Sequence, residues 1–424
     1  MRLISLSIII FITILVSCDT ASNVEPTFES YFTKYYGEDG EQVGVDIVLN
    51  EDGSMILLGN SFSQSAAVSP LVIKTDALGN IIWQLNLRPS VTSSINETAV
   101  DIEPINGGQF VLVSNVQNVV STIRVYVINQ DGSLADSVTL KDPESQVAKS
   151  ITQSSDNGFL ITGYKAPDPT RNPVPVDPTL DQADILLLKV NSSLDSIKKL
   201  SRGGGEQKGS GVKAYEFSLS NTIYYLVFGH SDEPRNENAP FQSRYQLFSV
   251  VENSTPTGLY GFSENEIQEE QIATATLKIP ASSGDGYLMV GSTTPIGGGA
   301  SDLYLLRFIK PEKVGEVLKS LDRKIPISGR RIEGVSAANA APDGFFIVAN
   351  EIRDNNKRDI FLLKVERNGS VTWTASFGSL EGDDTVGGVA ALPDGRIAVV
   401  GTIELETQRK MALIVTNPNG QFSD

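Results

Sequence analysis

Two residue types that often carry chemistry occur once each in this chain. His230 is the only histidine and Cys18 the only cysteine among 424 residues. One histidine cannot form a multi-histidine metal site, and no identifiable nucleophile accompanies it as a Ser-His-Asp triad would require. The glycine-rich segment "RGGGEQKGSG" lacks the Gly-Lys-Ser/Thr of a phosphate-binding loop. The sequence therefore predicts no catalytic residue, metal or cofactor.

Acidic residues recur at a fixed spacing, but the recurrence favours a structural role. An aspartate precedes three similar apolar runs, and a basic residue follows it five positions later: Asp184 and Lys189, Asp302 and Arg307, Asp359 and Lys364. Repeated positions of this kind typically fix a loop through side-chain-to-backbone hydrogen bonds. The segment "EGDD" at Glu381–Asp384 has calcium-type ligands but no EF-hand-like spacing.

The net charge of the chain excludes one class of partner. The formal charge is −17 and the isoelectric point about 4.6. A nucleic-acid-binding protein needs cations to displace phosphate counterions, so no nucleic-acid partner is expected. A basic group within 323–331 stands out against this background and suits either an acidic partner or a solvated linker: Arg323, Lys324, Arg330 and Arg331.

The N-terminal segment predicts export and lipid attachment. "MRLISLSIIIFITILVSC" has one arginine, an apolar run too short to span a bilayer, and then Leu15-Val16-Ser17-Cys18. Leu-Val-Ser-Cys resembles the lipobox of bacterial lipoproteins, and that resemblance implies cleavage before Cys18 and its acylation. We expect a signal peptide at 1–17, a flexible tether at 18–30 and a folded domain at 31–424. The alternative is an ordinary secretory signal with an incidental cysteine.

The rest of the chain is a set of seven repeats. Each unit contains a turn of Asp, Asn or Gly, a short apolar run, a second apolar run, another polar turn and a final strand, as in "NEDGSMILLGNS" followed by "PLVIKTDALGNIIW". The turn residues are those that tolerate positive φ. In the first unit the expected strands are Val45–Leu49, Met55–Ser61, Leu71–Asp76 and Asn80–Leu87.

Nearly continuous apolar runs indicate strands buried on both faces, and a fixed repeat of such units predicts an all-β fold, a seven-bladed β-propeller with four antiparallel strands per blade. The last unit stops where its fourth strand should begin. "FTKYYG" near the N-terminus matches "WTASFG" of the sixth unit, so residues 31–37 are expected to complete the last blade. Residues 311–324 have helical spacing, but the repeat favours a strand there.

The units resemble a bacterial β-propeller repeat common in exported Bacteroidetes proteins. The match is carried by "FGSLEGDDTVGGVAALPDGRIAVVGT" and "RDIFLLKVERNGSVTWTASFG", with the repeat's tryptophan kept at Trp83 and Trp373. The resemblance covers about Tyr31–Asp424 and implies the fold. It implies little about activity, because one fold serves many functions.

Long insertions gather on one face of the expected ring, around the third to fifth units. They include "KAPDPTRNPVPVDPTLDQAD" and "SDEPRNENAPFQSRY". Long loops on a rigid scaffold often carry binding residues, although they can also be tolerated surface insertions. The binding candidates on this face are Arg171, His230, Arg235, Phe241, Arg244 and Tyr245.

These observations predict a non-catalytic binding or scaffold subunit, anchored by lipid in the outer membrane and associated with an envelope or nutrient-uptake complex. The first alternative is a surface glycan-binding protein, for which Phe241 and Tyr245 would supply exposed aromatic rings. The second is a polysaccharide lyase or hydrolase, which would need converging carboxylates or a Tyr/His pair.

Overall fold

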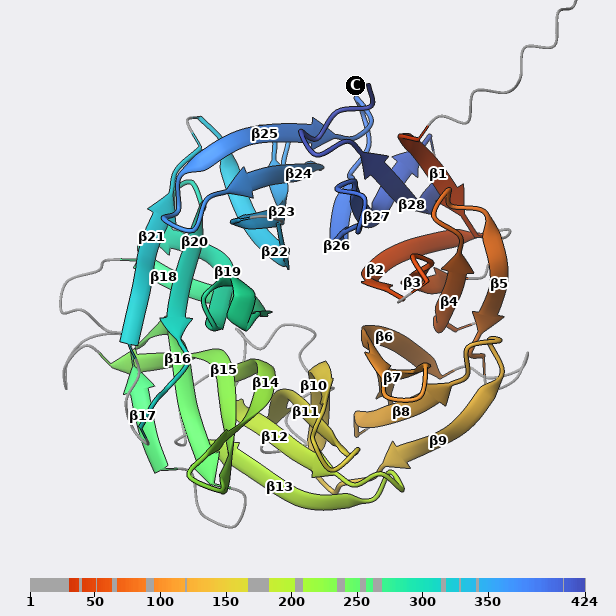
Figure 1. Ribbon diagram of the computed structural model, residues 1–424. Coiled ribbons are helices and arrows are strands. Elements are labelled where there is room, and N and C mark those ends of the chain that lie inside the picture. The colour runs from red at the N-terminus through yellow and green to blue at the C-terminus, as the bar shows by residue number, and fades with distance from the viewer. Residues whose placement is uncertain are drawn as a thin grey trace, which may run out of the picture.

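Seven four-stranded antiparallel sheets are arranged as blades around a central axis (Figure 1). The computed structural model describes residues 30–423, except 38–39, 51, 63–66, 89–94, 119, 167–182, 203–208, 235–240, 252–256, 262–268, 314–317, 328, 341–342 and 407. The only helix among the described residues is a 3-10 turn at Ala281–Ser283. The chain is a seven-bladed β-propeller, as its repeats predict.

Each blade runs from an innermost strand to an outermost strand. The innermost strands are β2 (Glu41–Leu49), β6 (Asn96–Ile105), β10 (Ser145–Gln153), β14 (Gly209–Leu219), β18 (Glu269–Ile279), β22 (Arg331–Asn339) and β26 (Thr385–Ala391). The second strands are β3 (Met55–Phe62), β7 (Gln109–Gln117), β11 (Phe159–Ala166), β15 (Thr222–Pro234), β19 (Gly286–Pro295), β23 (Phe345–Ile352) and β27 (Ile397–Leu405).

The outer half of each blade follows the same order. The third strands are β4 (Ser69–Thr75), β8 (Thr122–Ile128), β12 (Asp184–Val190), β16 (Phe241–Val251), β20 (Asp302–Ile309), β24 (Arg358–Val365) and β28 (Gln408–Thr416). The outermost strands are β5 (Ile81–Asn86), β9 (Leu134–Leu140), β13 (Ser196–Arg202), β17 (Thr257–Gly261), β21 (Leu318–Ile325), β25 (Val371–Phe377) and β1 (Phe32–Tyr36). Strand β21 lies at the end of the segment 311–324, so the strand that the repeat predicts there is confirmed and the helix suggested by the spacing of its apolar residues is not.

The seventh blade joins the two ends of the chain. Strand β1 pairs antiparallel with β28, from Phe32 opposite Val415 to Tyr36 opposite Met411. The blade therefore has the order β1-β28-β27-β26, and its outermost strand comes from the N-terminus (Figure 1). The predicted closure by residues 31–37 is confirmed. Such pairing covers an edge of β28 that would otherwise be open.

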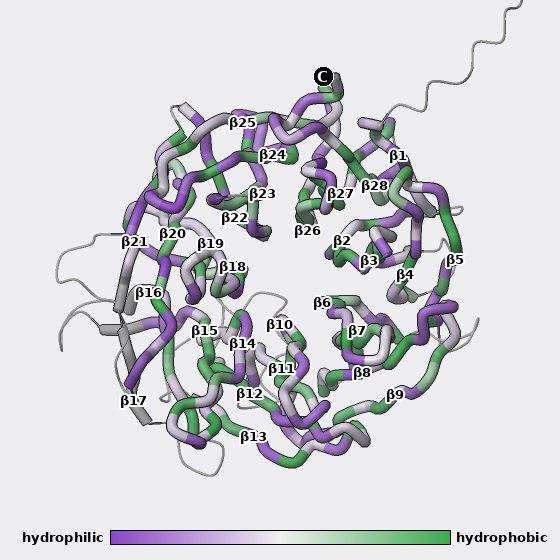
Figure 2. The backbone as a smooth tube through the Cα atoms, viewed as in Figure 1, coloured by the Kyte–Doolittle hydropathy of each residue, from purple (hydrophilic) through white to green (hydrophobic). Residues whose placement is uncertain are grey.

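The hydrophobic core consists of seven clusters, and each lies between two adjacent blades. In β3, Ile56 and Leu58 pack toward blade 2, whereas Met55 and Leu57 pack toward blade 7. All four side chains are fully buried. Because both faces of such a strand are covered, its apolar run is continuous rather than alternating. Hydrophobic segments accordingly occur in all seven blades (Figure 2).

Every innermost strand carries a β-bulge at the same place. The register between first and second strands shifts once per blade, for example between Gly44 and Asp46 in β2 and between Ala99 and Asp101 in β6. A bulge inserts an extra residue and re-aims the side chains that follow it. The bulges therefore set which side chains reach the axis of the ring.

The recurrent aspartates lie at the start of the third strands and make structural contacts. Asp302 lies 3.0 Å from Lys324, and Asp359 lies 3.3 Å from Arg353. The partners are basic side chains, whereas the sequence favoured backbone groups. The basic residue later in the strand acts similarly, since Lys189 Nζ lies 2.6 Å from Asp156 in the turn between β10 and β11.

Other charged segments singled out in the sequence are also engaged in the fold. In the basic group, Lys324 pairs with Glu269 at 2.6 Å and Arg330 with Glu351 at 2.8 Å. In "EGDD", the buried Asp384 accepts a hydrogen bond from the backbone N–H of Glu404 at 2.7 Å. No helix long and apolar enough to cross a membrane occurs within the described ranges.

Candidate binding site in the central channel

A cavity of about 630 Å³ lies on the axis of the ring and is lined by residues of all seven innermost strands. In several strands the lining runs from the middle toward the C-terminal end, as with Asp46–Val48 in β2 and Thr274–Lys278 in β18. These ends lead into the short turns between first and second strands. The cavity therefore lies toward the face opposite the long insertions.

One register position supplies much of the chemistry of the cavity. It is the first paired residue after the bulge in each innermost strand, here called the ring position: Asp46, Asp101, Ser150, Lys213, Ala275, Ser336 and Gly388 in blades 1 to 7. All except Gly388 line the cavity. Charged residues thus occupy blades 1, 2 and 4, whereas blades 5 to 7 carry small ones.

The two ring aspartates connect neighbouring blades. Asp46 accepts a hydrogen bond from the backbone N–H of Ile102 in the next blade at 3.4 Å, and Asp101 accepts one from that of Ile151 in the next blade at 2.8 Å. Asp46 also accepts one at 2.8 Å from the backbone N–H of Ile47 in its own strand. Desolvation inside the channel, followed by the negative charge of Asp101 and a hydrogen bond with its side chain, raises the pKa of Asp46 well above its ordinary value. Asp46 therefore keeps its proton to a higher pH than an ordinary aspartate does.

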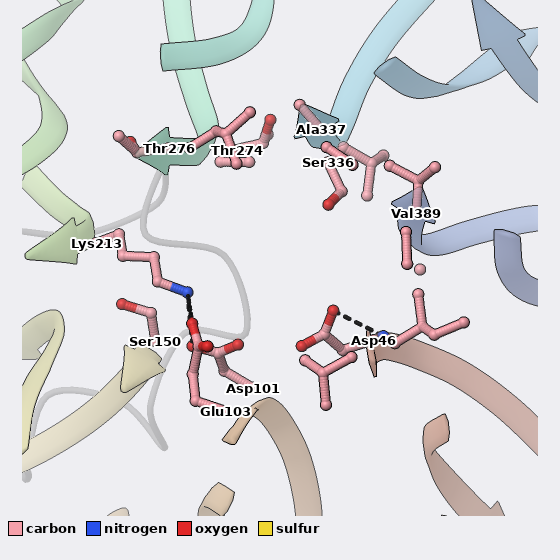
Figure 3. A pocket seen from close by; sticks show the side chains of 18 of the residues that line it. Asp46, Asp101, Glu103, Ser150, Lys213, Thr274, Thr276, Ser336, Ala337 and Val389 are labelled. Atoms are coloured by element: carbon pink, nitrogen blue, oxygen red, sulfur yellow. Dashed lines mark hydrogen bonds and ion pairs between the residues drawn. The ribbon is translucent and has the colours of Figure 1, made fainter. Parts of the chain in front are cut away.

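Lys213 reaches across blade 3 to the acidic residues of blade 2 (Figure 3). Its Nζ lies 3.4 Å from Asp101 and forms a shorter contact with Glu103. Ser150, the ring residue of the intervening blade, is small enough to leave this path open. Burial alone would lower the pKa of Lys213, but Asp101 and Glu103 outweigh it and hold that pKa well above its usual range.

The opposite side of the cavity carries hydroxyl groups and small apolar side chains. Thr274 Oγ1 donates to the carbonyl oxygen of Gly334 in the next blade at 2.7 Å. Tyr215 donates from its hydroxyl to the carbonyl oxygen of Thr276 at 2.6 Å. Ala337 and Val389 lie across the cavity from Lys213 (Figure 3). The site is therefore acidic on one side and weakly polar on the other.

No protein-family model and no curated protein matches this chain. Among solved structures, the C-terminal WD40 domain of Sif2 is similar with a TM-score of 0.47 and 12% identity, over 91% of this chain and 99% of that chain. Synechocystis apocarotenoid oxygenase is similar with a TM-score of 0.45 and 11% identity, over 78% of this chain and 71% of that chain.

A GH93 α-L-arabinofuranosidase of Fusarium graminearum, in complex with arabinobiose, gives a TM-score of 0.44 and 10% identity, over 75% of this chain and 93% of that chain. Similarities at this level carry no argument about function. The fold assignment rests on the strand order of the chain itself.

The structure brings three of the predicted loop-face candidates together in one hairpin. His230 in β15 pairs with Tyr245 in β16, and Ser231 pairs with Arg244. All three candidates are buried, with His230 8%, Arg244 3% and Tyr245 0% exposed. Arg171, Arg235 and the side chain of Phe241 lie outside the described residues. For these, the prediction of a binding role stays a prediction.

The expectation that Tyr245 offers an exposed aromatic ring is wrong. Its ring packs against Tyr304 of blade 5 at 5.1 Å between centroids, and its hydroxyl donates to the carbonyl oxygen of Tyr304 at 3.2 Å. The insertion "SDEPRNENAPFQSRY" is shorter as a loop than expected, because β15 continues to Pro234 and β16 begins at Phe241. Strand extension turns Tyr245 into a core residue between blades.

The channel residues were missed by the sequence analysis, although the repeat carries a signal for them. Each innermost strand has a residue two positions before the ring position that is usually Gly or Ala, as in Gly44, Ala99 and Gly211. Aligning the first strands on this small residue would have collected the ring position. Among the described residues no group of three or more His, Cys, Asp or Glu is placed to hold a metal ion.

Proposed function

We propose that this protein is a non-catalytic binding or scaffold protein of the bacterial envelope, anchored by lipid at Cys18 to the outer membrane and associated there with a protein partner. The lipobox-like "LVSC" supports the anchor and the location. Two or three acyl chains give durable attachment, whereas one chain gives only reversible binding. The propeller provides a rigid platform on which the long insertions of blades 3 to 5 form a partner surface.

One observation carries the non-catalytic part of this proposal: the ionisable groups of the channel are engaged with one another. Asp101 contacts Lys213, Glu103 contacts Lys213, and Asp46 has a hydrogen bond with the Asp101 side chain. Glycosidases hold two carboxyl groups roughly 5 to 10 Å apart, so that a sugar or a water fits between them. The hydrogen bond between the Asp46 and Asp101 side chains keeps these two carboxyl groups closer together than that.

A polysaccharide lyase or hydrolase is the second candidate. It is favoured by the raised pKa of Glu103, which burial raises despite the opposing charge of Lys213, because a protonated carboxyl group can act as a general acid. In that case the channel should turn over a polysaccharide, and Glu103→Gln should abolish the turnover.

The anchoring proposal is tested by fractionating cells that produce the full-length protein with a C-terminal tag. The wild-type protein should sediment with outer membranes and need detergent for release, whereas Cys18→Ser should not. Ser17→Ala is the matched control, since small residues are accepted before the lipidated cysteine. Equal membrane association of the wild type and Cys18→Ser would overturn the anchor.

The scaffold proposal is tested on the same material. Purification in mild detergent from native membranes should recover an outer-membrane protein in stoichiometric amount, and a variant lacking residues 167–182 should lose it. Recovery of the propeller alone would overturn the scaffold role and leave ligand binding as the function.

A further inference from the structure

The outer edge of blade 1 exposes two adjacent isoleucines. Ile81 and Ile82, at the start of β5, are 51% and 56% exposed. The pairing with β4 skips Ile82, which is the extra residue of a β-bulge between Ile81 and Trp83. In a regular strand, one of two successive side chains would point to the opposite face and be covered there. Strand β5 is also the edge of its sheet, and exposed apolar side chains on such an edge favour association with another surface.

The end of the expected tether lies beside these isoleucines. One nitrogen atom, Arg396 Nη1, donates to the carbonyl oxygens of both Ser30 at 3.0 Å and Ala77 at 3.1 Å. Ala77 belongs to the turn at 76–80, which leads directly into β5. Strands β1 and β5 accordingly lie side by side on the outside of the ring (Figure 1). The first described residue, Ser30, therefore leaves the ring next to the start of β5.

The tether is short compared with the folded domain. Ser30 is the twelfth residue after Cys18, so the chain between them spans at most about 40 Å when fully extended. A globular domain of this length is about 50 Å across. If Cys18 is acylated, the surface next to Ser30 is therefore held at the membrane at a higher effective concentration than the far side of the ring.

A lysine lies between the end of the tether and the isoleucines. Lys34 Nζ donates to the carbonyl oxygen of Leu78 at 2.6 Å and to Asn80 Oδ1 at 2.8 Å, and both of these oxygens are uncharged. Asp76 of the same turn accepts hydrogen bonds from the backbone N–H groups of Leu78 and Asn80. Aliphatic side chains with a lysine beside them suit a lipid surface, because the former enter the apolar boundary and the latter reaches the phosphates.

We propose that Ile81, Ile82 and Lys34 form a lipid-contact surface, here called the rim surface, on which the anchored protein rests. This inference rests on the proposed lipid anchor and adds an orientation to it, with the outer edge of blade 1 against the bilayer. Blades 4 and 5 lie across the ring from β5 (Figure 1). Their long insertions therefore remain accessible to a protein partner.

The test requires an attached protein, since even one myristoyl chain gives only reversible binding and two half-exposed isoleucines bury less apolar surface. Cys18 is the only cysteine, so the mature chain, residues 18–424, couples there alone to a maleimide-bearing phosphatidylethanolamine. The vesicles are otherwise phosphatidylcholine, because anionic lipid would repel a chain with a charge of −17.

The two tryptophans of the chain report which edge of the ring meets the bilayer. Trp83 and Trp373 occupy the same repeat position in blades 1 and 6. Each is measured alone, in the variants Trp373→Phe and Trp83→Phe, in vesicles with and without nitroxide-labelled lipid. Nitroxide lipids quench tryptophans close to the bilayer, so Trp83 should be quenched more strongly than Trp373. Equal quenching of the two would overturn the proposal.

A double variant and a matched control locate the contact. Ile81→Ser combined with Ile82→Ser should remove most of the difference between Trp83 and Trp373. Ile296→Ser should leave that difference unchanged, because Ile296 is 43% exposed but follows β19 on the face that carries the long insertions. Far-ultraviolet circular dichroism confirms that each variant is folded. Quenching of Trp83 that survives in the double variant would overturn the role of the isoleucines.

The other possible occupant of the rim surface is a second copy of the chain. Sedimentation of the uncoupled protein should show a monomer, and a dimer that the double variant dissociates would overturn the lipid contact. Since maleimide supplies the attachment, the quenching result does not depend on acylation in cells. Loss of Trp83 quenching overturns the orientation alone, whereas membrane association that survives Cys18→Ser overturns the anchor of the proposed function.

Discussion

Trp83 in the outermost strand of blade 1 donates a hydrogen bond from its Nε1 to the backbone carbonyl oxygen of Gln130 in blade 2, at 2.9 Å. The indole also covers Gly132 of the same turn, where an added Cβ would meet its Cδ2 at 2.7 Å. Gly132 has a φ of +84°, so a side chain there would also be strained. The tryptophan of the repeat therefore connects adjacent blades, by a hydrogen bond and by packing against the neighbouring turn.

Removing the Trp83 side chain should destabilise the ring. Trp83→Ala should lower the free energy of unfolding by about 3 kcal/mol, through lost burial and the lost hydrogen bond. Trp83→Phe should cost about 1 kcal/mol. The neighbouring Ile82, 56% exposed, provides the control Ile82→Ala, which should cost little. Urea unfolding followed by tryptophan fluorescence of Trp373 and by circular dichroism measures all three, and equal midpoints for Trp83→Ala and Ile82→Ala would contradict the role.

The N-terminal strand uses the same contact to close the ring. Tyr36 donates from its hydroxyl to the carbonyl oxygen of Gly79 at 2.7 Å, and Lys34 Nζ donates to that of Leu78 at 2.6 Å. Phe32 covers Gly79 as Trp83 covers Gly132. Blade 7 thus holds the turn of blade 1 through residues of β1.

A protein that begins at residue 38 should therefore lose its closure. Compared with one that begins at residue 30, it should melt at least about 10 °C lower or fail to fold, because a whole edge of β28 is exposed. Tyr36→Phe, in the longer protein, should cost about 1 kcal/mol. Calorimetry measures the melting temperatures of the shorter protein, the longer protein and its Tyr36→Phe variant. Similar melting temperatures with and without residues 30–37 would show that closure by β1 contributes little.

The fold could be predicted because the repeat imposes it locally. The residue types within one unit are enough to predict its turns and buried strands, and comparison between units predicts that the last strand comes from the N-terminus. The aromatic position of the repeat also has the same role in three blades. Phe32, Trp83 and Trp373 pack against Gly79, Gly132 and Gly420, respectively. Errors arose where a strand was extended by residues that read as a loop. Tyr245 belongs to such an extension, and pairing with β15 outweighed the polar composition around it.

The channel could not be predicted because it is made by register rather than by local pattern. Asp101 and Lys213 are separated by a whole blade in the sequence and meet only because each follows a bulge in an innermost strand. The bulge itself leaves only a weak mark, a small residue two positions earlier. Loop length drew attention to the opposite face, where the described candidates proved to be buried.

Lys213 should be needed to stabilise the acidic side of the channel. Its side chain is 16% exposed and its partners Asp101 and Glu103 are 11% and 28% exposed. Lys213→Met would leave the carboxylates partly buried without a cation and should cost about 2–4 kcal/mol. Adding Glu103→Gln to Lys213→Met should recover part of the loss. Chemical unfolding of the single and double variants tests this, and a double variant less stable than Lys213→Met would refute the pairing.

Asp46 should make the stability of the ring depend on pH. Its folded pKa is raised, by desolvation first and then by Asp101, whereas that of an unfolded aspartate is about 3.9. The folded state therefore holds a proton that the unfolded state loses, and the stabilisation is complete below about pH 4 and disappears as the pH rises through the folded pKa. Lys213 and Glu103 face the same space, and the charge of Lys213 lowers the pKa of Asp46 whereas that of Glu103 raises it.

Asp46→Asn removes this titration while keeping an oxygen for the N–H of Ile47 and an N–H for Asp101. Relative to the wild type, its stability should increase from pH 4 to pH 8. Asp131→Asn is the control, because hydrogen bonds from Ser133 lower the pKa of Asp131. Its effect on stability changes only around and below the ordinary aspartate pKa of about 3.9, so its difference from the wild type should stay nearly constant above about pH 5. Melting temperatures of the three proteins across this pH range give the slopes. An Asp46→Asn difference that stays constant with pH would show that folding does not raise the pKa of Asp46.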